Sequence, residues 1–586
     1  MRHSLHALSI VLFIPSAVHA QDLVPEWGGP IGGGGGESGT GIVLDNTGHV
    51  YTTGGFNGTM DVDPGPGVTN LTSAGGTDIY VTKFDTSGTL IWARAMGGTG
   101  TDGSLALAVD ASGNVYTTGG FCGTADFDPG AGISTMTAAT TDQYDIFISK
   151  LDSNGDFVWA KGIIGGTWWD NAYGIAIDPS SNVVVTGRFY YQGGPRDFDP
   201  GPGTFFLTAG HEDIFVLKLD TDGEFIWARD FGTGPDESRG YSIALDAAGN
   251  IFTTGYFRGT VDFDPDTSTF NMTSVGTWNV FYNKMDPDGN LVWVKSLPIS
   301  TTTYHVDGGY GKKISIDQDG NMLTTGRYSG TIDFDPGVGV TQLTSTGLYD
   351  IYVSKYTTNG ELVWAKSLGG AEHDEGYGIA AHADGSVLAV GTFQQTADFD
   401  PGANALDLVS VGDDDMFILN LDGNGDLLSA ASMGGTDIDR AYALASSSTG
   451  AIYLNGWFAG ATDLDPGSGA LNAIAGGSSD AFLIKLVVSD GTGIDGPASF
   501  IEAGMSIYPN PASERVQIML EASATGQPGV IEVFDVTGKR VHAEQVTSLS
   551  ALQQFELSSE WRAGSYLVMV KVEGREPKSA RMVIRH

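Results

Sequence analysis

The sequence has a single cysteine, Cys122, in 586 residues. One cysteine can form neither an internal disulfide nor a cysteine-based metal cluster, so packing alone must stabilise the fold. We predict that Cys122 is a small, buried, apolar residue. Long apolar runs are scarce too. No stretch reaches the roughly 18 consecutive apolar residues of a membrane-spanning helix, so no transmembrane segment is expected in the mature protein.

Basic residues are also few. Lys and Arg number 29 against 70 Asp and Glu, which gives a formal net charge of −41. Residues 504–586 hold nine residues of each sign, so the acidic excess belongs to the chain before them. Such a negative surface repels phosphate backbones, so no nucleic acid is expected as a partner. Divalent cations and cationic ligands suit it better.

The N-terminus has the pattern of a secretory signal peptide. A basic start precedes the apolar run Leu8–Ile14, and the small-residue site Val18-His19-Ala20 follows before Gln21. We therefore predict a signal peptide over residues 1–20 and export of the mature chain.

The chain that follows is a repeat. An Asp-x-Asp-Pro tetrad recurs at spacings of 65, 71, 65, 71, 65 and 65 residues, and begins at Asp61, Asp126, Asp197, Asp262, Asp333, Asp398 and Asp463. Each unit holds four strand-like segments joined by Asp-Gly turns; in the second unit these are residues 105–110, 114–121, 145–152 and 156–161. Seven units of four antiparallel strands predict an all-β fold, a seven-bladed β-propeller over residues 21–488.

A tryptophan marks the fourth segment of the units. It occurs at Trp92, Trp159, Trp227, Trp293 and Trp364, and the sixth copy has Ser429 instead. Trp27 lies 34 residues before Asp61, the same offset as Trp92 to Asp126, so it is in register. The last unit has no fourth segment of its own after Lys485. We predict that Val24–Gly28 supplies it and closes the ring, because an open array would leave exposed edges. The repeated tryptophans should pack between neighbouring blades.

Units such as "YGIAID…NVVVTGRF…DFDPG…DIFVLKLDTDGEFIWAR" resemble the seven-bladed beta-propeller (SBBP) repeats of exported bacterial proteins. The resemblance covers about residues 24–488. It implies the propeller fold and no settled activity.

Composition changes after Val488. A linker at residues 489–503 precedes residues 504–586, where alternating segments and Gly turns predict a small β-sandwich. Tyr508-Pro509-Asn510-Pro511, Asp535–Lys539, Ala563–Tyr566 and the terminal strand resemble the C-terminal sorting domain of type IX secretion cargo in the Bacteroidetes. The resemblance implies that the type IX machinery translocates the chain across the outer membrane, followed by release or surface anchoring. An ordinary accessory β-domain is the alternative.

The Asp-x-Asp pairs lie in long loops on one predicted face. Such a pair can share calcium if other oxygens complete a set of ~6–8. The candidates are Asp61, Asp63, Asp126, Asp128, Asp197, Asp199, Asp262, Asp264, Asp333, Asp335, Asp398, Asp400, Asp463 and Asp465. The acids of the blade connections are expected on the same face: Asp102, Asp170, Asp236, Asp307, Asp374 and Asp437. The alternative is that the Asp-x-Asp aspartates cap turns by accepting backbone amides.

One 71-residue interval concentrates aromatic residues in adjoining loops, namely Trp168, Trp169, Tyr190 and Tyr191. Exposed aromatic rings can stack on sugars or anchor a protein partner, and packing of an enlarged loop is the alternative. The other long interval carries His305, which is expected to be an ordinary surface residue.

These features favour a non-catalytic binding, adhesion or scaffold module, secreted or held at the outer-membrane cell surface. Its ligand, a glycan or a surface protein, stays open, and no cofactor other than calcium is suggested. The sequence has no nucleophile elbow, zinc-binding helix motif or phosphate loop, so an enzyme is not expected. The alternatives are a secreted enzyme and a calcium-stabilised surface-layer component. That enzyme would act on glycans or resemble the quinoprotein dehydrogenases. The segment "LDTDGEFIWA" is similar to the tryptophan repeat of those dehydrogenases.

Overall fold

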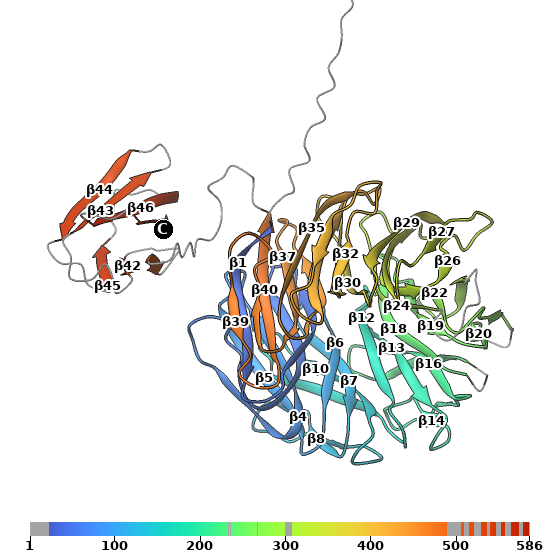
Figure 1. The fold of residues 1–586 in the computed structure, drawn as a ribbon. Helices are drawn as coiled ribbons and strands as arrows, with labels where there is room; N and C mark the ends of the chain where they lie inside the picture. Colours follow the sequence, from blue (N-terminus) through green and yellow to red (C-terminus); the bar gives the residue numbers. More distant parts are fainter. Residues whose placement is uncertain are drawn as a thin grey trace, which may run out of the picture.

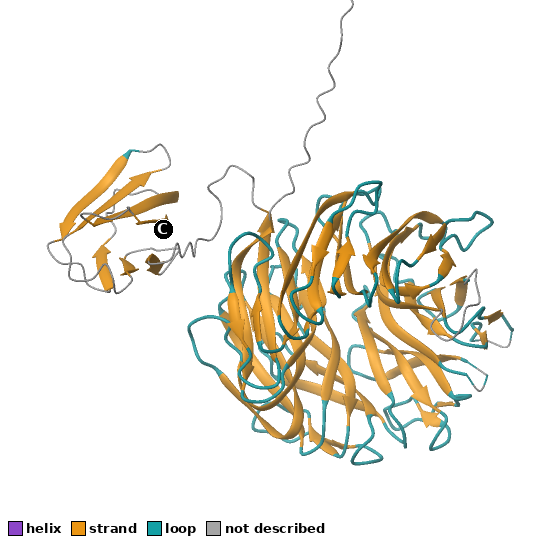
Figure 2. Cartoon of the chain, viewed as in Figure 1, coloured by secondary structure: helices purple, strands orange, loops and turns teal. Residues whose placement is uncertain are grey.

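The computed structural model describes residues 23–488, apart from residues 233, 235, 266–267 and 299–307. Beyond them it describes residues 505–508, 515–520, 529–535, 539–546, 552–556, 564–572 and 578–584. These residues form strands, turns and loops, and none of them lies in a helix that could cross a membrane. The protein has an all-β, β-propeller-like fold (Figures 1 and 2). The predicted signal peptide, the linker and His305 lie outside the described residues.

Antiparallel strands associate in groups of four, which we number as units 1 to 7. Unit 1 comprises β2 (Ser38–Leu44), β3 (Val50–Asp61), β4 (Asn70–Phe84) and β5 (Leu90–Gly98). Unit 2 comprises β6 (Gly103–Val109), β7 (Val115–Phe121), β10 (Asp145–Leu151) and β11 (Phe157–Ile163). Unit 3 comprises β12 (Asn171–Ile177), β13 (Val183–Tyr190), β16 (Glu212–Leu219) and β17 (Phe225–Phe231).

Unit 4 comprises β18 (Ser238–Leu245), β19 (Ile251–Phe257), β22 (Asn279–Met285) and β23 (Leu291–Leu297). Unit 5 comprises β24 (Gly308–Ile316), β25 (Met322–Ser329), β28 (Asp350–Tyr356) and β29 (Leu362–Gly370). Unit 6 comprises β30 (Glu375–Ala381), β31 (Val387–Phe393), β34 (Asp415–Leu421) and β35 (Leu427–Gly435). Unit 7 comprises β36 (Asp439–Ser446), β37 (Ile452–Phe458), β40 (Asp480–Val488) and β1 (Leu23–Gly33).

The first strand of the chain completes the last unit. β1 runs antiparallel to β40, with Leu23 opposite Val488 and Trp27 opposite Lys485. The two strands, blue and orange, lie side by side in Figure 1. The first strand of each unit lies against that of the next, and β36 lies against β2. The predicted pairing of Val24–Gly28 with the strand near Lys485 is confirmed.

Short hairpins extend the units beyond the four predicted segments. They comprise β8 (Thr124–Asp126) with β9 (Thr135–Thr137), β14 (Arg196–Asp197) with β15 (Phe206–Leu207), β20 (Thr260–Asp262) with β21 (Asn271–Thr273), β26 (Thr331–Asp333) with β27 (Gln342–Thr344), β32 (Thr396–Asp398) with β33 (Asp407–Val409), and β38 (Ala461–Asp463) with β39 (Asn472–Ile474). Several pair with the fourth strand of the preceding unit, as Gly97 does with Asp126. The Asp-x-Asp-Pro loops therefore tie one unit to the next.

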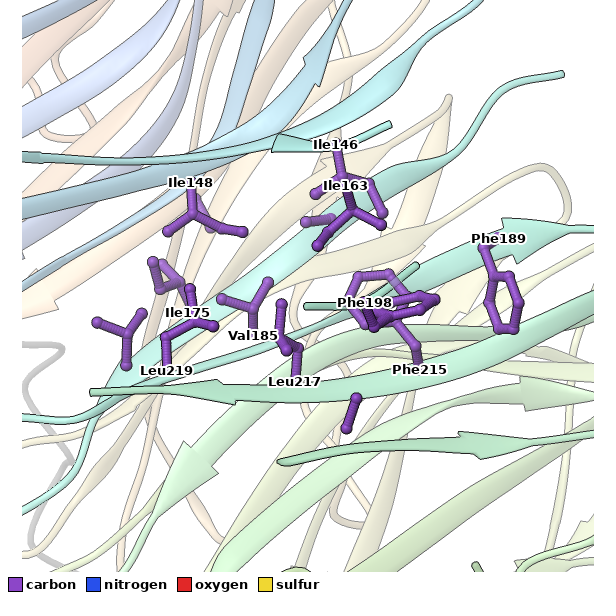
Figure 3. Packing of buried hydrophobic residues seen from close by; sticks show 14 of the residues in the cluster. Ile146, Ile148, Ile163, Ile175, Val185, Phe189, Phe198, Phe215, Leu217 and Leu219 are labelled. Atoms are coloured by element: carbon purple, nitrogen blue, oxygen red, sulfur yellow. The ribbon is translucent and has the colours of Figure 1, made fainter. Parts of the chain in front are cut away.

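The core lies between units. Figure 3 shows Ile146, Ile148 and Ile163 of unit 2 facing apolar side chains of unit 3 such as Val185 and Leu217. Because each middle strand is covered on both faces, it is a continuous buried run and does not alternate, as β7 and β10 show.

The repeated tryptophans join neighbouring units, as predicted. Trp92, Trp159, Trp227 and Trp364 are at most 9% exposed. Indole Nε1 of Trp92 donates to a carbonyl in the following unit's turn, 3.1 Å away, and Trp27, Trp159, Trp293 and Trp364 make the equivalent bond. Cys122 is buried, as expected.

The described C-terminal strands form two antiparallel sheets. One has the order β41 (Met505–Tyr508), β42 (Arg515–Leu520), β45 (Leu552–Glu556). The other has the order β44 (Arg540–Val546), β43 (Gly529–Asp535), β46 (Gly564–Val572), β47 (Lys578–Ile584). Parts of the predicted sorting motifs, including Pro509–Pro511, lie outside the described residues.

Candidate functional site

Unit 3 presents an aromatic patch, which we define as Trp168, Trp169, Tyr191 and His211. The two indoles and Tyr191 are 41%, 45% and 45% exposed, respectively. The ring centroids of Trp168 and Trp169 are 6.1 Å apart, and those of Tyr191 and His211 are 5.6 Å apart. Tyr190 connects the two pairs, at 6.2 Å from Trp168 and 6.0 Å from His211. Together the five rings form one contiguous aromatic cluster.

Tyr190 differs from its predicted companions because it is buried, with 7% exposure. It ends β13, whose side chains are all buried between units, whereas Tyr191 lies beyond the strand. The structure therefore brings all four predicted aromatic residues together but leaves three of them available to a ligand.

A buried arginine shapes the loop that carries this patch. Arg196 is fully buried, and its Nε lies 2.9 Å from Asp170 Oδ2. The same guanidinium donates to the carbonyls of Tyr190 and Gly194, while Asp170 accepts the amide of Tyr190 at 2.8 Å. Burial raises the pKa of Asp170 to about 6, although Arg196 opposes the shift. One ion pair thus fixes the loop.

A cluster of three charged side chains contacts Tyr190. Glu212 is fully buried and pairs with two arginines: Arg188 Nη1 lies 3.3 Å from Oε1, and Arg239 contacts both carboxylate oxygens. Arg188 also lies over the ring of Tyr190, 5.4 Å from its centroid. The ring of Tyr190, which links the two exposed pairs of the patch, therefore lies against this ion-pair cluster.

A second buried carboxylate, three units further on in unit 6, also pairs with two basic side chains. Glu375 lies 3.0 Å from both Lys312 Nζ and Arg327 Nη1, and Tyr377 donates to it at 3.0 Å. Burial alone would raise the pKa of Glu375, but Lys312 and Arg327 hold it below its ordinary value. The carboxylate of Glu375 therefore stays ionised and paired with both cations, so it is unsuited to transfer protons.

Aromatic and cationic side chains also line up across the first strands of five units. Tyr173 and Tyr241 have centroids 5.3 Å apart, Lys312 Nζ lies 4.5 Å from Tyr241 and 5.8 Å from Tyr377, and Tyr377 lies 4.9 Å from Tyr442. These residues occupy one repeated position. The sequence analysis missed this run, although the position departs from the apolar pattern of strands and could have signalled it.

The Asp-x-Asp pairs cap turns. In the first loop Asp61 Oδ1 accepts the amides of Asp63 and Thr69, and Asp63 Oδ1 accepts that of Gly65. The first aspartate of all seven loops makes the same pair of bonds. The turn-capping interpretation is confirmed. Calcium at these pairs stays a prediction, and no group of three or more acid, His or Cys side chains among the described residues could hold a metal.

The connecting acids differ in how far they are buried. Asp102, Asp170 and Asp374 are fully buried, while Asp437 is exposed and Asp236 is intermediate. Asp307 lies outside the described residues.

Residues 506–585 match the family described as a secretion system C-terminal sorting domain. The predicted resemblance is confirmed for this part of the chain. The protein is therefore cargo of type IX secretion and reaches the cell surface or the extracellular space.

Two curated proteins are similar to part of the chain. An uncharacterized WD repeat-containing protein of Acanthamoeba polyphaga mimivirus is 23% identical over 511 residues, which is 74% of this chain and 36% of that protein. The regulatory protein FlaEY of Caulobacter vibrioides is 29% identical over 214 residues, 36% of this chain and 22% of that protein. The chain thus spans little more than a third of the first relative and less than a quarter of the second.

Two solved structures from Porphyromonas gingivalis are similar at low scores. PorZ, described as an essential bacterial surface component of the type-IX secretion system, is 12% identical with a TM-score of 0.20 over 95% of this chain and 100% of that one. Dimeric latent PorU is 12% identical with a TM-score of 0.13 over 64% of this chain and 32% of that one.

Proposed function

We propose that the protein is a secreted, non-catalytic binding module. In this proposal units 1 to 7 are the blades of a closed propeller, the C-terminal strands form a β-sandwich, and the aromatic patch of unit 3 binds a glycan. Cyclic contact of the first strands and the pairing of β1 with β40 support the closed ring.

The observation that carries the binding role is the exposure of Trp168, Trp169 and Tyr191 on a rigid support. Burying large aromatic side chains is favourable, so a soluble surface that leaves three adjacent rings uncovered indicates an interaction site. Flat faces of this kind stack on sugar rings. Among the described residues of this site, the carboxylates Asp170 and Glu212 are both occupied by arginine, which favours binding over acid–base catalysis.

A glycan array probed with the mature protein tests the proposal. The double variant Trp168→Ala/Trp169→Ala should lose roughly fivefold to 150-fold in affinity, since two stacked rings contribute ~0.5–1.5 kcal/mol each beyond their burial. Phe270→Ala is the matched control, because this ring is 48% exposed in unit 4, away from the patch. Equal binding by the double variant and the wild type would exclude the patch. If the wild type binds surface proteins and no glycan, the ligand of the patch is a protein and not a glycan.

A further inference from the structure

Neighbouring units share a repeated pair of buried carboxylates, and we call each such place a junction. One acid begins the buried run of a unit's third strand, and the other precedes or opens the first strand of the next unit. The aspartate pairs are Asp78/Asp102 (junction 1/2), Asp145/Asp170 (2/3), Asp350/Asp374 (5/6) and Asp415/Asp439 (6/7). All eight side chains are at most 3% exposed. Two buried like charges at close range are costly unless something neutralises them.

A glycine lets the two carboxylates converge. A Cβ atom placed on Gly97 would lie 2.7 Å from Asp78 Oδ1 and 3.0 Å from Asp102 Oδ2. Gly97 has a φ of +150°, a conformation that other residues rarely adopt. Gly369 repeats this geometry at junction 5/6, with one oxygen of each aspartate within 3.1 Å of the same point. Carboxylate oxygens from two units thus approach each other beside a glycine, where no side chain separates them.

Junction 2/3 carries its own cation. The guanidinium of Arg196 pairs with Asp170, and backbone amides donate to the remaining oxygens of Asp145 and Asp170. All four carboxylate oxygens therefore have a partner. The buried charge at this junction is balanced from within the chain.

The other aspartate junctions lack this arginine. The position equivalent to Arg196, one residue before the Asp-x-Asp-Pro tetrad, is Ala125 at junction 1/2, Ala397 at 5/6 and Thr462 at 6/7. At each of these junctions at least one buried carboxylate oxygen has no hydrogen-bond partner; these atoms are Oδ1 of Asp78, Asp350, Asp415 and Asp439. An unpartnered buried carboxylate oxygen requires a positively charged or donating neighbour.

We propose that junctions 1/2, 5/6 and 6/7 each bind a hard, oxygen-preferring metal cation, with calcium as the probe, which supplies the charge that Arg196 supplies at 2/3. The aspartates of two units would provide the carboxylate ligands, and carbonyl or water oxygens would have to supply the rest, since calcium accepts irregular mixed sets of oxygens. These sites differ from the Asp-x-Asp loops. Each metal would clamp two neighbouring units together.

A shared proton is the competing occupant. Burial raises the pKa of Asp374 and of Asp439 to about 7, and the neighbouring Asp350 and Asp415 add to the shifts. A direct count of bound metal distinguishes a metal cation at these junctions from a shared proton.

The test uses the mature protein, equilibrated with millimolar calcium and then dialysed. Bound calcium is counted by atomic emission, and thermal midpoints are compared in calcium and in EDTA at pH 7. We expect one retained ion per proposed junction and a lower midpoint after chelation. Asp415→Asn should remove one ion. Asp213→Asn is the matched control, because Ser238 replaces the second acid at that junction, and Asp400→Asn tests the Asp-x-Asp loops; neither should change the count.

A gain of metal provides the reverse test. Arg196→Ala makes junction 2/3 resemble 1/2 and 5/6, so this variant should bind one additional calcium ion and show a larger midpoint loss in EDTA. If Arg196→Ala does not fold, the Asp415→Asn count decides. Absence of retained calcium together with an unchanged midpoint in EDTA would overturn the proposal in favour of a shared proton. Loss of calcium in Asp400→Asn but not in Asp415→Asn would overturn it in favour of the loops.

Discussion

Replacing Trp27 by alanine should weaken the contact that joins the two ends of the repeat. The indole Nε1 donates to the Thr86 carbonyl at 3.2 Å, and the ring centroid lies 6.4 Å from Phe84 and 5.9 Å from Tyr453. Loss of the hydrogen bond removes ~0.5–1.5 kcal/mol. Exposure of roughly 100 Å² of apolar surface removes about 2.5 kcal/mol more. We expect the free energy of unfolding to fall by ~3–4 kcal/mol.

Urea unfolding of the mature protein, followed by fluorescence, measures this loss. Trp92→Ala is the matched variant, because its indole bonds the next unit at 3.1 Å within a continuous stretch of chain. Similar losses are expected in both variants, with early proteolytic release of the N-terminal strand in Trp27→Ala alone. If Trp27→Ala stayed within about 0.5 kcal/mol of wild type while Trp92→Ala was destabilised, closure by β1 would not contribute to stability.

Three further predictions concern single side chains. Glu212→Gln leaves the buried guanidinium of Arg188 and the partly buried one of Arg239 without their carboxylate and should cost ~3–5 kcal/mol in urea unfolding. Lys161→Ala, which removes a partly exposed pair, should cost less than about 1 kcal/mol. Burial chiefly raises the pKa of Asp213 to about 7, so the folded state binds this proton more tightly than the unfolded state, whose pKa is ~4. Its stabilising contribution is therefore full below pH ~4 and is lost towards pH ~7. In Asp213→Asn the thermal midpoint should change less with pH across this range than in the wild type. The same pH dependence in both proteins would contradict the raised pKa of Asp213. Ser429→Trp should not stabilise the protein, while Trp364→Ser should cost ~3 kcal/mol by the same assay.

The sequence predicted the repeating units because their period is carried by local signals, the Asp-Gly turns and alternating segments. It also predicted the role of Trp27, since register is preserved across the break in the chain. It did not predict the short hairpins, because segments such as Thr124–Asp126 are too brief to show a period. The Glu212 and Glu375 clusters were missed because their partners come from different units, up to 63 residues away for Lys312 and Glu375.

Ser429 is explained by the seam at which the first and last strands of the repeat pair. In units 1 to 5 the tryptophan packs against the turn between the third and fourth strands of the following unit. Unit 6 is followed by unit 7, whose fourth strand is β1, so no turn connects it to β40. Among the described residues, a tryptophan at position 429 would therefore lack such a turn to pack against. The one departure in the tryptophan series thus marks the seam of the ring.

The loop between Trp169 and Arg196 connects the candidate binding site to the junctions. Arg196 neutralises Asp170 and also holds the carbonyl of Tyr190, next to the exposed Tyr191. Because this cation is covalently part of the chain, the loop that presents the patch needs no metal to keep its shape. The other aspartate junctions, which have no arginine, would depend on metal under the proposal above. Removal of calcium should therefore lower the thermal midpoint while ligand binding by the patch persists at temperatures below that midpoint.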